Sequence, residues 1–169
     1  MLTLLLRLLH VGGGVVWVGG VVVTTFFLFP AARATGPSGA VVMRQLAGVQ
    51  KFPIFMMVVG LVTVLSGITL FMRNAMGDNN QWGGTTAGIT FSVGGLLALI
   101  ALVIGMVRNR PLAAKMADVG AQLQGAGTPP PANLVAEMTR LQDSLHTASI
   151  VVAYLLLGAT AAMSVARYL

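Results

Sequence analysis

A histidine and a row of small residues share one face of the first apolar segment. On a helical wheel, His10, Gly13, Gly14 and Trp17 lie on the same side because steps of three and four residues separate them. An imidazole can ligate a haem iron, and glycines leave space for a flat ligand. Ionisable side chains inside a membrane are costly, so His10 is the first candidate for a functional site.

The second histidine, His146, is expected near the opposite membrane face, roughly 20 Å from His10. Two imidazoles on one iron need nitrogens about 4 Å apart, which excludes a haem held by both histidines of one chain. For His10 the alternative role is a hydrogen bond to a neighbouring hydroxyl or carbonyl group. His146 is interpreted as a polar residue of a helix interface.

Other residues on the same half of the membrane as His10 are candidates for completing a haem site. Met72 and Met163 are candidate second ligands of the iron, although a five-coordinate haem needs neither. Arg7 and Arg73 are candidate partners of the haem propionates. The predicted metal ligand is His10.

Several chemistries are disfavoured by the residues present. The chain has 10 methionines, which suit Cu(I), but no Met-x-x-Met motif, so copper handling ranks behind haem. There is no cysteine, no paired catalytic carboxylates and no phosphate-binding glycine loop after a strand. The four acidic residues lie outside the apolar runs, which disfavours hydrolases and ion-driven transporters. No pattern assigns an enzymatic reaction.

Composition places the candidate residues in a membrane protein. Of 169 residues, 56% are hydrophobic and only 8% are charged. We therefore predict an all-α integral membrane four-helix bundle that forms a single transmembrane domain over residues 1–169 and contacts the lipid bilayer. The predicted crossings cover about residues 4–29, 52–71, 86–107 and 148–166.

The charges predict an orientation. The net charge is +6, and most basic residues lie in the first and third loops. The positive-inside rule then predicts that both termini lie outside, in a bacterial-type inner membrane. Because membrane orientation accounts for the basic residues, we do not expect the protein to bind nucleic acid. The basic residues on the side of the first and third loops are Arg33, Arg44, Lys51, Arg108, Arg110, Lys115 and Arg140. The basic residues on the side of the two termini are Arg7, Arg73 and Arg167.

The loops carry local signals of their own. In the cytoplasmic loop 108–147, apolar residues at helical spacing from Leu112 to Leu123 predict an amphipathic helix at the membrane surface. A Gly/Pro-rich linker, 125–131, follows it. Asn133 is the predicted N-cap of a helix that continues into the fourth crossing. The loop 73–85 is short and polar.

Small residues predict where the crossings meet, because they let helix backbones approach in lipid. The predicted contact positions are Gly60, Thr63 and Gly67, then Gly88, Ser92 and Gly95, and finally Tyr154, Gly158 and Ala161.

The first helix resembles known small membrane proteins. Leu8-Leu9-His10 followed by Val16-Trp17-Val18-Gly19-Gly20, and later Leu65-Ser66-Gly67, are similar to segments of CopD-type copper-resistance domains, related uncharacterised families and HemJ-type protoporphyrinogen oxidases. For HemJ-like proteins the resemblance implies haem b on His10. It also implies a lysine within the bundle, but Lys51 and Lys115 lie outside the apolar runs. The CopD-like resemblance implies copper handling.

Three functional hypotheses follow. In the first, the protein binds haem b through His10 at the outer half of the membrane and serves electron transfer or a related redox step with a membrane redox partner. In the second, it is a non-catalytic accessory or structural subunit of a larger membrane complex. The third is copper handling.

Overall fold

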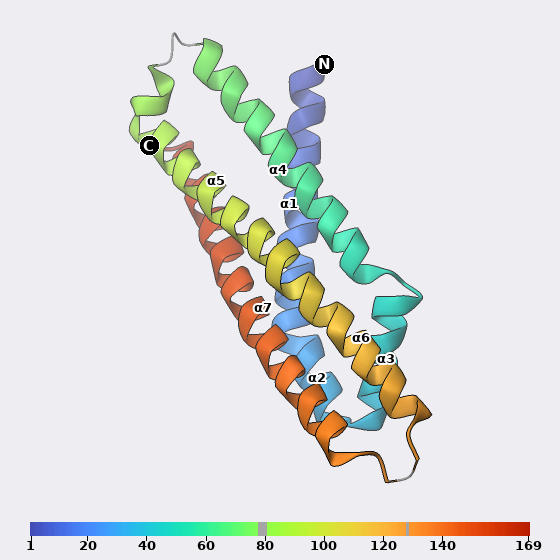
Figure 1. Ribbon diagram of the computed structural model, residues 1–169. Coiled ribbons are helices and arrows are strands. Elements are labelled where there is room, and N and C mark those ends of the chain that lie inside the picture. Colours follow the sequence, from blue (N-terminus) through green and yellow to red (C-terminus); the bar gives the residue numbers. More distant parts are fainter. Residues whose placement is uncertain (78–80, 128) are drawn as a thin grey trace.

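The computed structural model describes residues 1–77, 81–127 and 129–169, and the regular structure within them is helical throughout. Within these described ranges, four helical segments are long and apolar enough to cross a membrane: Leu2–Ala34, Phe52–Gly77, Thr86–Gly125 and Ala132–Ala166. They form an elongated bundle with both termini at one end, here called the terminal end (Figure 1). The prediction of an all-α protein with four candidate spans is confirmed.

The bundle consists of two helix pairs, each contiguous in sequence. In the first pair, α1 (Leu2–Val23) packs on α4 (Phe52–Gly77). In the second pair, α5 (Thr86–Ile104) and its extension α6 (Arg110–Gly125) pack along α7 (Ala132–Ala166). Contacts between the pairs, from α4 to α5 and from α1 to α7, are fewer.

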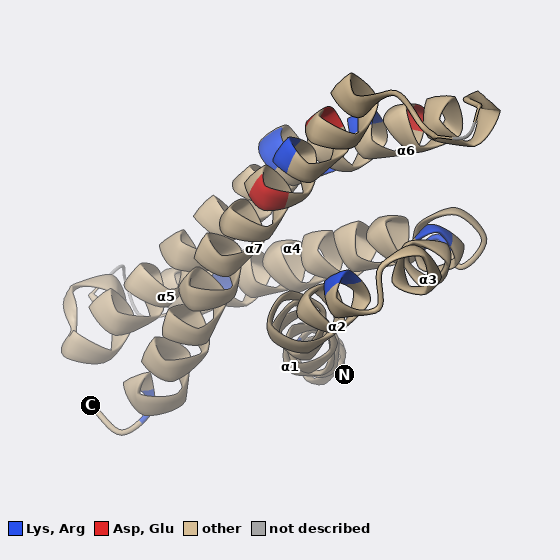
Figure 2. Ribbon diagram, turned by 90° about the horizontal axis from the view of Figure 1, so that it is seen from below, with Lys and Arg blue, Asp and Glu red and all other residues tan. Residues whose placement is uncertain are grey.

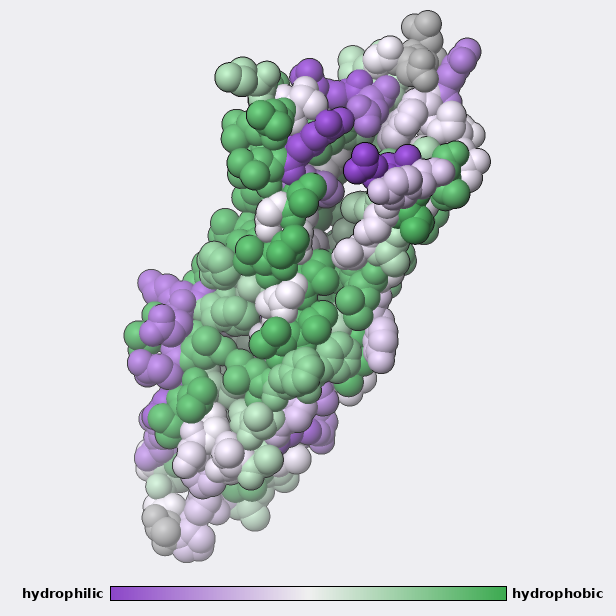
Figure 3. All heavy atoms as spheres, turned by 180° about the vertical axis from the view of Figure 1, so that it is seen from behind, coloured by the Kyte–Doolittle hydropathy of each residue, from purple (hydrophilic) through white to green (hydrophobic). Residues whose placement is uncertain are grey.

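The shared core lies where the two pairs meet. The indole of Trp17 and the side chain of Leu156 are among its most buried groups, at 5% and 1% exposure. Long apolar side chains cover the outside, as suits contact with lipid, and form a broad hydrophobic band between the more polar ends (Figure 3). The buried core cluster is Trp17, Met56, Val64, Ala101, Leu102, Val152 and Leu156.

Two π-helical turns interrupt the first and third spans, and each precedes a proline. Thr24–Leu28 (η1) precedes Pro30 in α2 (Phe29–Ala34), and Gly105–Asn109 (η3) precedes Pro111 in α6. Proline has no N–H and its ring crowds the carbonyl four residues earlier. A π turn relieves that conflict, so both helices continue past their prolines instead of ending there.

Several predicted boundaries need correction. The second span continues as helix to Gly77, because its polar end still forms backbone hydrogen bonds. A separate helix, α3 (Pro37–Gly48), follows a turn at Gly36, whose φ of 58° suits glycine. Asn133 is not the N-cap, because α7 already begins at Ala132 after Pro131. The predicted loop 73–85 and linker 125–131 include residues 78–80 and 128, which lie outside the described residues.

The predicted amphipathic helix is present as α6. It directly continues α5 through η3, and it packs along the first half of α7 instead of lying alone on the membrane surface. Leu112, Met116 and Leu123 are accordingly only half-buried. The prediction that the last helix runs straight into the fourth crossing is confirmed by the 35 residues of α7.

The predicted contact positions are confirmed on α4 and partly wrong elsewhere. On α5, Gly94 is buried against α7, whereas the predicted Gly95 faces open space. On α7, the predicted Tyr154 is 63% exposed, and the neighbouring Ala153 is fully buried. Gly94 and Gly95 are adjacent small residues, and periodicity alone does not choose between adjacent positions.

Candidate functional site

The interface between α1 and α4 sets large side chains of one helix against glycines or other small residues of the other. The imidazole of His10 covers Gly67, where an added Cβ would lie 2.6 Å from the ring atom Cε1. Gly13 lies against Thr63, and an added Cβ would lie 2.5 Å from Oγ1 of that side chain. Both glycines therefore permit the close approach of the two helices.

The same pairing of a side chain on one helix with a glycine on the other continues toward the middle of the bundle. The indole of Trp17 covers Gly60, where an added Cβ would lie 2.8 Å from Cε2 of the ring. Gly20 faces the methyl end of Met56, at 2.5 Å from an added Cβ. In this structure the space along the predicted glycine row is occupied by side chains of α4.

His10 makes one defined hydrogen bond across this interface. Its Nδ1–H donates to the backbone carbonyl of Thr63 at 2.8 Å, and since a carbonyl only accepts, the proton is on Nδ1. The same carbonyl also accepts a hydrogen bond from the Ser66 hydroxyl at 3.0 Å. Nε2 of His10 has no hydrogen-bond partner among the described residues.

The remaining predicted site residues are dispersed. Gly14 touches the methyl group of Thr63, with 3.8 Å between an added Cβ and Cγ2. Met163 lies in the other helix pair, against Gly94 of α5. The structure therefore brings His10, Gly13, Gly14 and Trp17 together, and it leaves Met72, Arg7 and Arg73 exposed.

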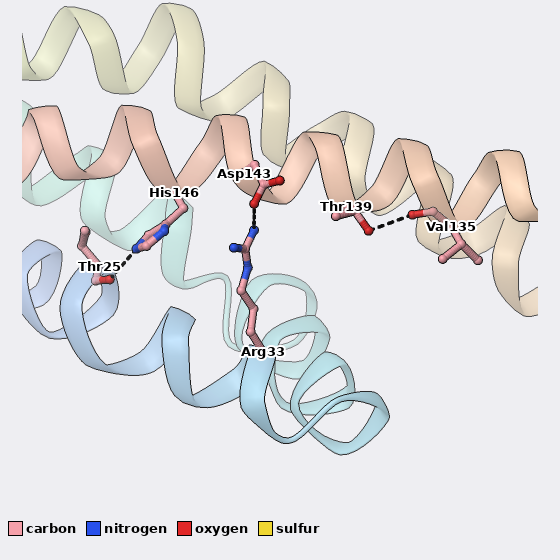
Figure 4. Close-up of polar contacts among 6 residues, drawn as sticks. All are labelled: Thr25, Arg33, Val135, Thr139, Asp143 and His146. Atoms are coloured by element: carbon pink, nitrogen blue, oxygen red, sulfur yellow. Dashed lines mark hydrogen bonds and ion pairs between the residues drawn. The ribbon is translucent and has the colours of Figure 1, made fainter.

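A second histidine contact lies at the opposite end of the bundle, here called the basic end. Nε2–H of His146 on α7 donates to the backbone carbonyl of Thr25 at 3.2 Å (Figure 4). The ring of Phe29 meets the imidazole edge-on. Close by, Arg33 and Asp143 form an ion pair of 2.7 Å, also between the first span and α7. These contacts tie the two helix pairs together.

The π turn explains why the Thr25 carbonyl needs a side-chain donor. In this turn the Phe29 N–H bonds to the Thr24 carbonyl, five residues back. The residue that would serve Thr25 in the same pattern is Pro30, which has no N–H. An unsatisfied carbonyl inside a membrane is costly, and His146 removes that cost. His146 thus lies at a helix interface, as its place in the sequence predicts. Thr25 is not among the predicted site residues, although Pro30, five positions later, is the sequence signal that points to it.

The two histidines serve different parts of the molecule. His10 and Thr25 are 15 positions apart on one nearly continuous helix, which corresponds to about 22 Å along its axis. His146, bonded at Thr25, is accordingly far from His10, in agreement with the expected separation. Within residues 1–77, 81–127 and 129–169, no three or more His, Cys, Asp or Glu side chains gather as a metal-binding group.

Comparisons of the chain with protein-family models, with curated proteins and with solved structures found no match. The two histidine contacts and the placement of the charges are the features of the molecule that bear on its function.

Proposed function

We propose that this chain is a non-catalytic accessory or structural subunit of a larger membrane complex, in which His10 fastens α1 to α4. The observation that carries this proposal is the filled interface: Gly13 and Gly67 are each covered by a polar side chain of the opposite helix. Helices in lipid associate through close packing and interhelical hydrogen bonds, since no hydrophobic drive acts between them. His10 contributes to both, because its ring packs against Gly67 and also donates a hydrogen bond to the Thr63 carbonyl.

The proposed setting is a bacterial-type inner membrane with both termini outside. Its support is the distribution of charge, because Lys and Arg are concentrated at the basic end, on α2 and α3 and along the α6–α7 arm (Figure 2). Cytoplasmic loops are enriched in these residues. Among the Lys and Arg residues that the structure describes, Arg7, Arg73 and Arg167 are the ones on the side of the terminal end.

Haem b binding is a second proposal, and it is favoured by the hydrogen bond that Nδ1 of His10 makes. Histidines that ligate metals usually donate their other N–H to a carbonyl or carboxylate, which is how Nδ1 of His10 is engaged. Nε2 would then hold the iron, and Arg7 and Arg73 would pair with the propionates. A bound haem supplies one-electron chemistry. To admit it, α1 and α4 would have to separate near Gly13. Copper handling stays a third proposal, resting on the methionine content.

One spectrum distinguishes the first two proposals. The full chain is purified in detergent from haem-replete cells, and its absorption is recorded for wild type, His10→Ala and the control His146→Ala. If His10 has only a structural role, the wild-type protein is expected to show no Soret band. His10→Ala is then expected to lower the free energy of unfolding by about 0.5–1.5 kcal/mol. A Soret band that disappears in His10→Ala and persists in His146→Ala would contradict the structural proposal and establish haem binding.

A further inference from the structure

A basic groove lies where the third span leaves the apolar part of the bundle. It has a volume of about 290 Å³ and is formed by η3 and the start of α6 on one side and by α7 on the other. Two of its lining residues are positively charged, one carries a hydroxyl group and the other three are apolar. The lining residues of this groove, here called the Arg108 groove, are Val107, Arg108, Pro111, Leu112, Lys115 and Ser144.

The Arg108 groove carries positive charge that the described part of the chain does not neutralise. Arg108 and Lys115 are seven residues apart, which places them on the same side of a helix, two turns from each other. The ion pairs of the described residues are Arg33 with Asp143 and Arg140 with Glu137. Neither cation of the groove takes part in them, so both are available to an anion.

The position along the helix sets the groove at the membrane boundary. Arg108 is the first charged residue after the apolar run 86–107, so the hydrocarbon core is expected to end there. Lys115 lies about 10 Å farther along the helix axis, at the level of the lipid headgroups. Val107, on the membrane side, is 71% exposed. The groove thus has a cationic side toward the headgroups and an apolar side toward the acyl chains.

We propose that the Arg108 groove binds the phosphate of an anionic phospholipid. Arg108 and Lys115 hold the phosphate oxygens, the Ser144 hydroxyl donates a further hydrogen bond, and an acyl chain lies along Val107. Guanidinium and ammonium groups at headgroup depth are the usual means by which membrane proteins recognise anionic lipids. Free phosphate offers the same anion without the acyl chain. The proposal depends on the membrane placement and is independent of the role of His10.

The test compares lipid retention by charge-matched variants of the full chain. The protein is purified in detergent with an equimolar mixture of phosphatidylglycerol and phosphatidylcholine, and bound lipids are counted by native mass spectrometry. Wild type is expected to retain phosphatidylglycerol in excess. Arg108→Gln with Lys115→Gln is expected to weaken that retention about tenfold or more. Arg44→Gln with Arg110→Gln removes the same charge outside the groove and is expected to change it less than about twofold.

Two further arms separate the groove from general electrostatic attraction and from free phosphate. Ser144→Leu fills the groove and keeps every charge, so it is expected to weaken retention about as much as the double variant does. Millimolar inorganic phosphate is expected to leave the bound lipid in place. The proposal is overturned by equal losses in both double variants, by unchanged retention in Ser144→Leu, or by release of the lipid by inorganic phosphate. Helical circular dichroism confirms that each variant is folded.

Discussion

At the scale of single residues, neighbouring glycines of α1 have opposite surroundings. Gly13 is in contact with Thr63, whereas an added Cβ at Gly12 would meet nothing within 4 Å. Both occupy the same helix, one position apart, so their intrinsic helix propensities are equal. Any difference between substitutions at the two positions therefore reports on the α1–α4 interface.

We expect Gly13→Ala to lower the free energy of unfolding by about 1–3 kcal/mol, because the new methyl group forces the Thr63 side chain and α4 away. Gly12→Ala is expected to be neutral or to stabilise by up to about 1 kcal/mol, since alanine favours helix. Chemical unfolding in detergent, followed by circular dichroism, measures both. Equal effects of the two substitutions would argue against the close α1–α4 contact.

The sequence was sufficient to place His10 and its companions on one helix face, because a helical repeat fixes which residues point together. It was not sufficient to say what fills the space beside the glycines. That depends on the partner helix, and the same glycines suit a flat cofactor or a threonine equally well. The structure supplies Thr63 and Met56 as the occupants.

At the scale of elements, the π turn of η1 and the imidazole of His146 form one unit. Pro30 leaves the Thr25 carbonyl without a backbone donor, and His146 supplies one from α7. The hydrogen bond thus compensates locally for the proline while it also joins the two helix pairs. The energetic effects of the two residues are therefore expected to be coupled.

A double-mutant cycle tests this coupling. His146→Ala is expected to cost about 1–2 kcal/mol in the wild-type background, because the Thr25 carbonyl loses its donor. In the Pro30→Ala background an alanine N–H can serve that carbonyl, so the same substitution is expected to cost less. Free energies of unfolding of the four proteins give the coupling energy. A cost of His146→Ala that is independent of residue 30 would refute the link.

Hydropathy predicts the spans of this chain well, but it does not predict how their surfaces are used. The four apolar runs are unmistakable because lipid excludes charge over about 20 residues. The choice of Gly94 over Gly95 and of Ala153 over Tyr154 as contact positions depends on helix rotation, which packing decides. The packing of α6 on α7 likewise depends on tertiary contacts. The apolar face of α6, from Leu112 to Leu123, would fit a membrane surface as well as another helix.

At the scale of the whole molecule, the two ends differ in charge, which leads to a direct test of orientation. The chain has no cysteine, so introduced cysteines report without background. Gln81→Cys lies at the terminal end and Ser38→Cys on α3 at the basic end, both at exposed positions. A membrane-impermeant maleimide is expected to label Gln81→Cys in intact cells and Ser38→Cys only after permeabilisation. The reverse labelling pattern would invert the proposed topology.

The division into two helix pairs has a consequence for biosynthesis. Each tightly packed pair joins segments that are neighbours in the chain, so α1 and α4 can complete their interface while the ribosome is still translating α5. Such local pairing avoids long searches for distant partners. The late step of assembly is then the docking of two finished hairpins, guided by the Trp17 core and completed when His146 reaches Thr25.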